Sequence, residues 1–386
     1  MATLLLATIP ANAFWSAALT MLGSYIDSKL FGPHVTQEVG KMSDLQMQTA
    51  SYGAPIPLIL GTCRSTGNVI WSTKFVEHTK TEKQGGKGGG GGVTTTTYSY
   101  TVSFAVGICQ GPITAIGRVW ADGKLVDLAK YQHTVYLGGD TQTPDSWMEA
   151  VEGAGNVPAF RGLAYIVFKD LAIGDFGNRI PSFSFEVTRQ IDNVKALVET
   201  VSLSAGLQYT DVDASDLEGL AITGISSAGD QTRRSIIEQL QAVFLFDSIE
   251  RSGKIVFKRR NANTAYEIPD EYLGAYETSP PNEPYNLQYK DERELPRRLT
   301  INYLSKDKDY QQGTMSAYRQ ITQSKNEQTV SVQMVMVDTD AKQLAEVRLF
   351  EEWQNRKTLS LTLSNQFGWL LPGDILKVPI QDQKQN

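Results

Sequence analysis

The sequence predicts a mainly β protein of the α+β class, with two β-barrel domains and a small α/β domain inserted between them. Three observations support this prediction. Apolar and polar residues alternate with a period of two through much of residues 51–187 and again from Leu299 onward, which is typical of half-buried strands. Between these stretches, residues 191–275 show helical spacing. A chain of 386 residues is long enough for two to four domains.

The first β domain is expected at residues 44–190. Residues 98–108 alternate between a large apolar face and a small, polar face, and residues 69–75 alternate similarly. The segment between these strands is polar and rich in glycine. It predicts a long hairpin over residues 78–98, whose tip (80–97) is either disordered or ordered by a partner.

Further strands of this domain are predicted at Ile116–Ala121, Ala164–Phe168 and Ser182–Val187. Turn-forming pairs such as Asp122-Gly123 separate them. Residues 120–160 are less regular, so we expect a small excursion there.

Residues 191–280 are expected to form the small α/β domain. Either Asp192 or Asn193 caps a first helix. A second helix is predicted near Asp230–Val243, and it runs into a hairpin at Phe244–Arg259.

A proline-rich linker, Ser279 to Pro284, leads into the second β domain at residues 281–386. Asp340 is predicted to cap the helix of this domain. One face of that helix carries apolar residues spaced four apart, namely Ala341, Ala345, Leu349 and Trp353. The return of strands after the α/β insert favours two barrels of similar architecture.

Residues 1–43 are predicted to form an apolar helix and an extension. No charged residue occurs before Asp27, and polar residues interrupt the apolar run. We therefore expect a helix over Phe14–Leu30 that docks on a partner or on the chain's own fold. Contact of this helix with a membrane is the alternative.

Composition argues against direct nucleic-acid readout. The net charge is −6, and no long block of Lys and Arg is present to grip phosphates. The two cysteines, Cys63 and Cys109, lie in apolar strand-like segments and are predicted to be buried in a reducing compartment. A single disulfide bond between them is the alternative.

No catalytic or cofactor-binding constellation is intact. The glycine run Gly85–Gly92 lacks the Lys-Ser/Thr pair and the helix of a phosphate loop. Gly224–Ala228 imitates a nucleophile elbow, but all three histidines precede it in the chain. Asp211 and Asp213 imitate a calcium loop that lacks its glycine and its final glutamate. The sequence predicts a protein that is not an enzyme and has no cofactor or metal.

The order of several strand and turn motifs resembles the tail-tip hub proteins of siphophages and gene transfer agents. The motifs are Tyr52–Gly61, Gly67–Trp71, Ala105–Ile113, Val119–Gly123, Tyr165–Phe168, Gly174–Pro181, Ser204–Leu207 and Leu371–Asp374. This resemblance covers about Asp44 to Val378.

The resemblance implies a virion protein of the tail tip or baseplate, assembled in the host cytoplasm. It implies a homotrimer in which each subunit carries two tail-tube-like barrels. Such a trimer joins the six-fold distal tail ring to a three-fold tip or fibre, beside the tape measure protein. DNA passes only transiently through its lumen.

The residues expected to make assembly contacts lie on the hairpin and on the N-terminal helix. They are Gly85, Lys87, Gly90, Thr95 and Tyr98 on the hairpin, with Phe14 and Trp15 on the helix. Two other functions stay open, a cell-wall-degrading hub enzyme and a membrane-contacting tip protein. There is no room for the hydrolase-like barrel that gene-transfer-agent relatives carry. The resemblance also leaves open whether the chain is a minimal hub or a fragment.

Overall fold

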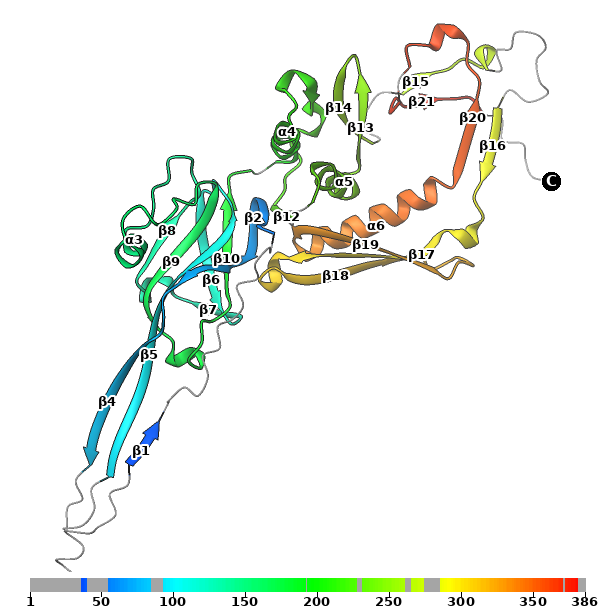
Figure 1. Ribbon diagram of the computed structural model, residues 1–386. Helices are drawn as coiled ribbons and strands as arrows, with labels where there is room; N and C mark the ends of the chain where they lie inside the picture. The colour runs from blue at the N-terminus through cyan, green and yellow to red at the C-terminus, as the bar shows by residue number, and fades with distance from the viewer. Residues whose placement is uncertain are drawn as a thin grey trace, which may run out of the picture.

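The computed structural model describes residues 36–39, 55–84, 93–191, 193–227, 231–260, 265–273, 285–370 and 372–380. The described chain is elongated (Figure 1). A β sandwich carries a long arm at one end, and an α/β layer lies in the middle. Beyond this layer, a sheet with one long helix leads to slender ribbons. The prediction of a mainly β protein with some helix is confirmed.

The sandwich has two layers of strands with an apolar core between them. One layer consists of β1 (Thr36–Val39), β3 (Asn68–Ser72), β4 (Val76–Gln84), β5 (Val93–Gln110), β8 (His133–Tyr136) and β9 (Leu163–Ala172). The other consists of β2 (Leu58–Thr66), β6 (Ala115–Ala121), β7 (Lys124–Val126) and β10 (Phe183–Arg189). The rings of Phe104, Phe168 and Phe183 stack in this core, with neighbouring centroids 5.1 and 4.6 Å apart. Burial of such rings is the main stabilising contribution to this part.

The predicted excursion at residues 120–160 supplies structured edges to the sandwich. It contributes β7 to one layer and β8 to the other, together with helix α3 (Ser146–Glu152). Asp145 caps this helix, because its carboxylate accepts hydrogen bonds from the backbone N–H groups of Trp147 and Met148.

The predicted hairpin is confirmed as the arm in Figure 1. β4 and β5 pair in antiparallel register from Val76–Thr101 to Gln84–Val93, and β1 adds to β5 in parallel. Residues 80–84 and 93–97 were expected in an unpacked tip, but they are paired strand. The β-branched threonines favour this conformation. Residues 85–92 lie outside the described part of the chain.

One sheet runs through both halves of the molecule. Its order is β18-β17-β19-β12-β2-β10-β6-β7. The strands not yet given are β12 (Gly224–Ser227), β17 (Pro296–Ser305), β18 (Gln311–Tyr318) and β19 (Asn326–Met336). β12 pairs with β2 on one side and with β19 on the other. Strands from three of the predicted segments therefore share a sheet, and the predicted domain boundaries stay a prediction.

The two predicted barrels are not confirmed. Within the described ranges no sheet closes on itself. A barrel needs its first and last strands to pair with each other. Here β2 and β19 pair instead with β12 and join the halves.

The α/β layer follows the predicted order. It contains α4 (Val194–Ser204), β11 (Val212–Asp213), α5 (Arg233–Phe244), β13 (Phe246–Arg251) and β14 (Lys254–Arg259). Asn193 is a cap of α4, since its side chain accepts a hydrogen bond from the backbone N–H of Ala196 at 2.7 Å. The alternative cap, Asp192, lies outside the described residues. The turn of the hairpin uses Ser252 and Gly253, both with positive φ.

The long helix α6 (Asp338–Gln354) covers the sheet formed by β17, β18 and β19 (Figure 1). It begins two residues before the predicted cap Asp340, so that position was wrong. The Asp338 carboxylate accepts hydrogen bonds from the hydroxyls of Tyr303 and Ser305, at 2.5 and 2.6 Å, which fixes the start of the helix on β17. The predicted apolar face is buried as expected: Ala341, Ala345, Leu349 and Trp353.

Two narrow ribbons form the far end of the described chain. β16 (Tyr285–Tyr289) pairs with β20 (Lys357–Leu361), and β15 (Tyr266–Glu267) pairs with β21 (Leu376–Lys377). The described 3-10 helices are Leu128–Lys130, Gly174–Phe176, Tyr209–Asp211, Ser215–Leu217, Asp270–Tyr272, Glu292–Glu294, Lys306–Lys308 and Asn365–Phe367.

The predicted N-terminal helix at Phe14–Leu30 and the linker at Ser279–Pro284 lie outside the described residues. Among the residues that are described, no helix has the length and apolar character needed to cross a membrane.

Candidate assembly sites

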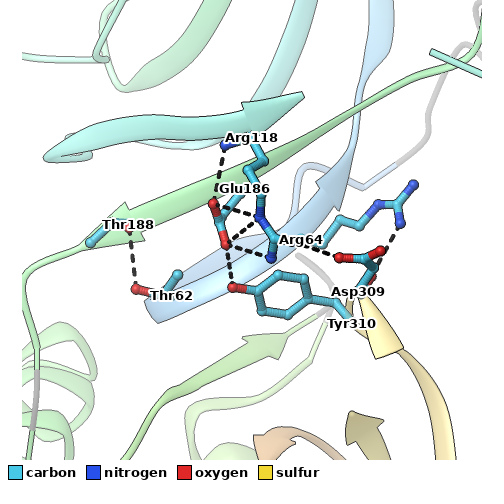
Figure 2. A network of polar contacts seen from close by, with 7 residues as sticks. All are labelled: Thr62, Arg64, Arg118, Glu186, Thr188, Asp309 and Tyr310. Carbon is cyan, nitrogen blue, oxygen red and sulfur yellow. Dashed lines mark hydrogen bonds and ion pairs between the residues drawn. The ribbon is translucent and has the colours of Figure 1, made fainter. Parts of the chain in front are cut away.

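A polar network joins the two halves of the molecule (Figure 2). Arg118 on β6 and Glu186 on β10 come from the sandwich, whereas Asp309 and Tyr310 come from the turn between β17 and β18. Asp309 and Tyr310 both have left-handed backbone conformations, with φ of 51° and 64°. Two successive residues in this conformation reverse the chain sharply, and the turn lies against the sandwich.

Glu186 is the acceptor at the centre of the network. It accepts a hydrogen bond of 2.5 Å from the Tyr310 hydroxyl and one of 3.1 Å from the backbone N–H of Arg118. The Arg118 guanidinium donates to the same carboxylate through Nε and Nη2, at 3.0 to 3.3 Å. Its remaining nitrogen, Nη1, lies 2.6 Å from the Asp309 carboxylate. One arginine therefore bridges a carboxylate from each half.

Arg64 on β2 reinforces this junction. It donates to the backbone carbonyl of Asp309 at 3.1 Å and to the Ser184 hydroxyl at 2.9 Å. Its guanidinium also lies 4.1 Å from the ring centre of Trp120, and that of Arg118 lies 5.0 Å from the same ring. The indole thus holds both cations in place through cation–π attraction.

The charges in the network persist across the physiological pH range. Burial opposes ionisation of Glu186, but the hydrogen bonds from Arg118 and Tyr310 outweigh it and lower the carboxyl pKa to about 2. Burial, together with the hydrogen bond to Glu186, raises the pKa of Tyr310 to about 12. Neither group changes its protonation near neutral pH.

A close backbone contact lies beside this network. A Cβ on Gly224 would come within 2.4 Å of the Thr62 carbonyl oxygen, and a Cβ on Gly61 within 2.5 Å of the Thr223 carbonyl oxygen. Only glycine allows β2 and β12 to approach this closely. Val335 on β19 and the Tyr310 ring are buried in the sandwich core, so packing also crosses the junction.

The arm is the second candidate site, and it carries two of the predicted contact residues. Thr95 pairs with Glu82 across the arm, and Tyr98 pairs with Thr79. Thr95 is half-buried in the three-stranded arm, while Tyr98 packs against the sandwich core near the base of the arm. The other predicted contact residues, Phe14, Trp15, Gly85, Lys87 and Gly90, lie outside the described residues.

The sequence motifs that imitate catalytic or metal sites have structural roles. The elbow-like serines, Ser226 and Ser227, lie in strand β12 rather than at a strand-to-helix turn. The Asp213 carboxylate accepts hydrogen bonds from the backbone N–H and the hydroxyl of Ser215. In the described ranges, no group of three or more histidines, cysteines and carboxylates is arranged to hold a metal ion.

The two cysteines are buried, as predicted, and both are free, so the bridge that the sequence left open is not formed. Burial raises the pKa of the Cys109 thiol to about 11, and it raises that of Cys63 as well. Both thiols therefore act as small apolar groups in the sandwich core.

Sequence reasoning missed the junction. Arg118 and Glu186 occupy polar positions on alternating strands, and Tyr310 follows a run of charged residues. No local pattern distinguishes them from solvated surface residues. Their partners lie 124 and 191 positions away in the chain, so only the folded topology brings them together.

Comparisons with known proteins agree on the class. Residues 232–386 match a family described as "Putative phage tail protein". A chain in the structure of the "Virion of native gene transfer agent (GTA) particle" matches with a TM-score of 0.75 and 25% identity. That match covers 97% of this chain and 92% of the other. The chain is a phage tail-type protein.

Two crystal structures match more weakly. The 43 kDa tail protein of prophage MuSo2 from Shewanella oneidensis has a TM-score of 0.30 and 12% identity, over 74% of this chain and 80% of that one. The tail protein from Neisseria meningitidis MC58 has a TM-score of 0.33 and 10% identity, over 82% and 84%. No curated protein matches the sequence significantly.

Proposed function

We propose that this protein is the structural hub of a phage-like tail tip, a homotrimeric adaptor that closes the tail tube. The observation that carries the proposal is the likeness of nearly the whole chain, at a TM-score of 0.75, to a chain of a gene transfer agent virion. The elongated shape supports it, because a subunit with projecting elements at both ends can contact several neighbours at once (Figure 1).

In this proposal the two halves of the subunit take the place of two tail-tube subunits. Three copies then present six similar units to the six-fold distal tail ring, and the same three subunits meet a three-fold tip or fibre on the other side. The open eight-stranded sheet would hold the two units of one subunit in a fixed relation. The junction around Glu186 and Arg118 would stiffen this relation, since it bridges the halves through ionic hydrogen bonds.

The arm suits a contact between neighbouring subunits. Most residues of β4 are exposed, and charged side chains such as Lys80 and Glu82 line this free edge. Charged edges discourage unspecific strand pairing. We therefore propose that the faces of the arm, which include Thr95, lie against another tail protein when the tip assembles.

The role is structural rather than catalytic in this proposal. The tape measure protein and a fibre or tip protein are its further partners, and DNA crosses the lumen only during ejection. The chain's net charge of −6 suits a passage to which DNA does not adhere.

Copy number tests the proposal. Quantitative mass spectrometry of purified tails should give three copies of this chain for each tail, against six for a distal ring protein. Tails made without the chain should lack the tip. A single copy for each tail, or intact tips without the chain, would contradict the hub.

A further inference from the structure

We propose that one face of the arm packs against the same face of the arm in neighbouring copies of this chain. This face, called the threonine face below, consists of Thr79 and Thr81 on β4 with Thr94 and Thr96 on β5. The inference rests on the proposed function, because it names the neighbour that the arm meets and the face by which they meet.

The threonine face continues the side of β5 that is buried in the sandwich. Side chains on a strand point alternately to its two sides, so the even-numbered residues of β5 share one side. On this side, Tyr100, Val102 and Phe104 are buried in the core, and Tyr98 packs against it. The second layer of the sandwich covers this side only as far as the base of the arm, and the described arm projects beyond it (Figure 1). The threonine face is therefore a core-facing side of β5 that has lost its covering layer.

The two faces of the arm differ in charge. The opposite face carries His78, Lys80 and Glu82, which are exposed, and Lys80 Nζ lies 2.7 Å from the Glu82 carboxylate. The threonine face has a hydroxyl and a methyl group at each of its four positions, and the hydroxyls of Thr81 and Thr96 lie 3.5 Å apart across the strands. Covering a charged group costs far more free energy than covering a hydroxyl that can form a hydrogen bond. The threonine face is thus the face that a neighbour can cover.

The arm also requires a covering layer for its own stability. At the level of residues 94–97 it is a sheet of three strands, β4, β5 and β1. None of the described side chains of residues 79–82 and 94–97 is buried. A sheet of this size that has no buried face is marginally stable in water, so packing against another sheet is what would order the arm.

A second copy of this chain is the neighbour that fits. A threonine hydroxyl both donates and accepts hydrogen bonds, so a face of threonines is complementary to a copy of itself. In the strand register, Glu38 of β1 lies beside Thr96, and Lys83 of β4 lies beside Thr94. The two edges of the face therefore hold residues of opposite charge. Arms placed around an axis, with their threonine faces inward, bring the acidic edge of one copy to the basic edge of the next, and a head-to-tail contact of this type closes a ring.

The width of the arm agrees with three copies. Strands lie about 4.8 Å apart, so a sheet of three strands is about 14 Å wide. Three such sheets around a three-fold axis would each lie about 4 Å from the axis, close to half of the spacing of about 10 Å between packed sheets. Threonine side chains would then fill the space between the three arms.

Cysteine cross-linking in assembled tails tests this contact. Thr96→Cys tails, treated with a short reagent that joins two thiols, should give covalent dimers of the chain on a denaturing gel. The matched control is Thr95→Cys, since Thr95 is the next threonine, is also half-buried and lies on the opposite face. It should give no dimers of this chain. The native cysteines are buried and do not contribute. An absence of dimers from Thr96→Cys, or equal amounts from both variants, would overturn the inference.

A second variant covers the case in which the cysteine variants do not assemble. Thr96→Lys should lower the yield of complete tails by about tenfold, because it brings like charges together between the arms. Thr358→Lys, at an exposed threonine of β20, should leave the yield unchanged. A normal yield for Thr96→Lys would refute the contact. Three copies for each tail without dimers of Thr96→Cys would refute the contact and leave the hub standing, whereas a different copy number would contradict both.

Discussion

Replacement of Glu186 by glutamine should weaken the junction between the halves in a pH-dependent way. The carboxylate accepts hydrogen bonds from Arg118 and Tyr310, and its side chain is only 18% exposed. A change of one in pKa corresponds to about 1.4 kcal/mol. The fall from the ordinary value of 4.5 to about 2 therefore corresponds to about 3 kcal/mol of stability at pH 7.

The direction with pH follows from the lowered pKa. Stability contributed by Glu186 is fully present above its unfolded pKa of about 4.5 and is lost as the pH falls toward 2. Glu186→Gln lacks this contribution at every pH. Urea unfolding of the purified chain should thus show a free-energy difference between the two proteins of about 3 kcal/mol at pH 7 that shrinks toward pH 2.5.

Glu218→Gln is the matched control. Glu218 is 77% exposed and lies 3.7 Å from Lys195. An exposed pair of this kind contributes about 0.5 kcal/mol or less. A Glu186→Gln difference no larger than that of the control, or one that stays the same between pH 7 and 2.5, would refute the account of the junction.

Three further predictions concern the close contact between β2 and β12, the arm, and the cysteines. Gly224→Ala should destabilise the chain by about 2 kcal/mol, because the added Cβ meets the β2 backbone. Gly139→Ala is the control and should not destabilise the chain, since there is open space around Gly139. Equal thermal unfolding midpoints for the two variants would contradict this prediction. Replacement of residues 80–97 by a two-residue turn should leave the unfolding midpoint unchanged and abolish tip assembly in electron micrographs. Normal tips would contradict the proposed role of the arm in assembly. Cys63 and Cys109 should resist a thiol reagent at pH 8 until the chain unfolds, since both are buried with raised pKa values; rapid labelling of the native chain would show that the core is open.

Much of the fold was predictable because local patterns determine it. The alternation of residues 98–108 predicts a strand with one buried face, and the large apolar face of β5 is buried as predicted. The small, polar face, which was expected to stay open, is buried as well, because Ala105 packs in a second cluster with Met148 and Val157. The spacing of Ala341, Ala345, Leu349 and Trp353 likewise reports the buried side of α6. The predicted start of this helix at Asp340 was wrong because a contact distant in sequence determines it. The helix begins at Asp338, whose carboxylate accepts hydrogen bonds from the hydroxyls of Tyr303 and Ser305.

The sheet order and the junction were not predictable from local patterns. Strand alternation shows that a face is buried, but it does not show which strand is the neighbour. For this reason the sequence favoured two separate barrels, whereas the short strand β12 joins the two halves. The network around Glu186 depends on the same topology, and its residues carry no signal of their own in the sequence.

The symmetry of the tail end tests the central claim most directly. The measurement is an electron-microscopy average of purified tails in which this chain is labelled at the arm. The hub account predicts three labels arranged with three-fold symmetry at the end of the tube. Six labels with six-fold symmetry, or labels along the length of the tube, would contradict it.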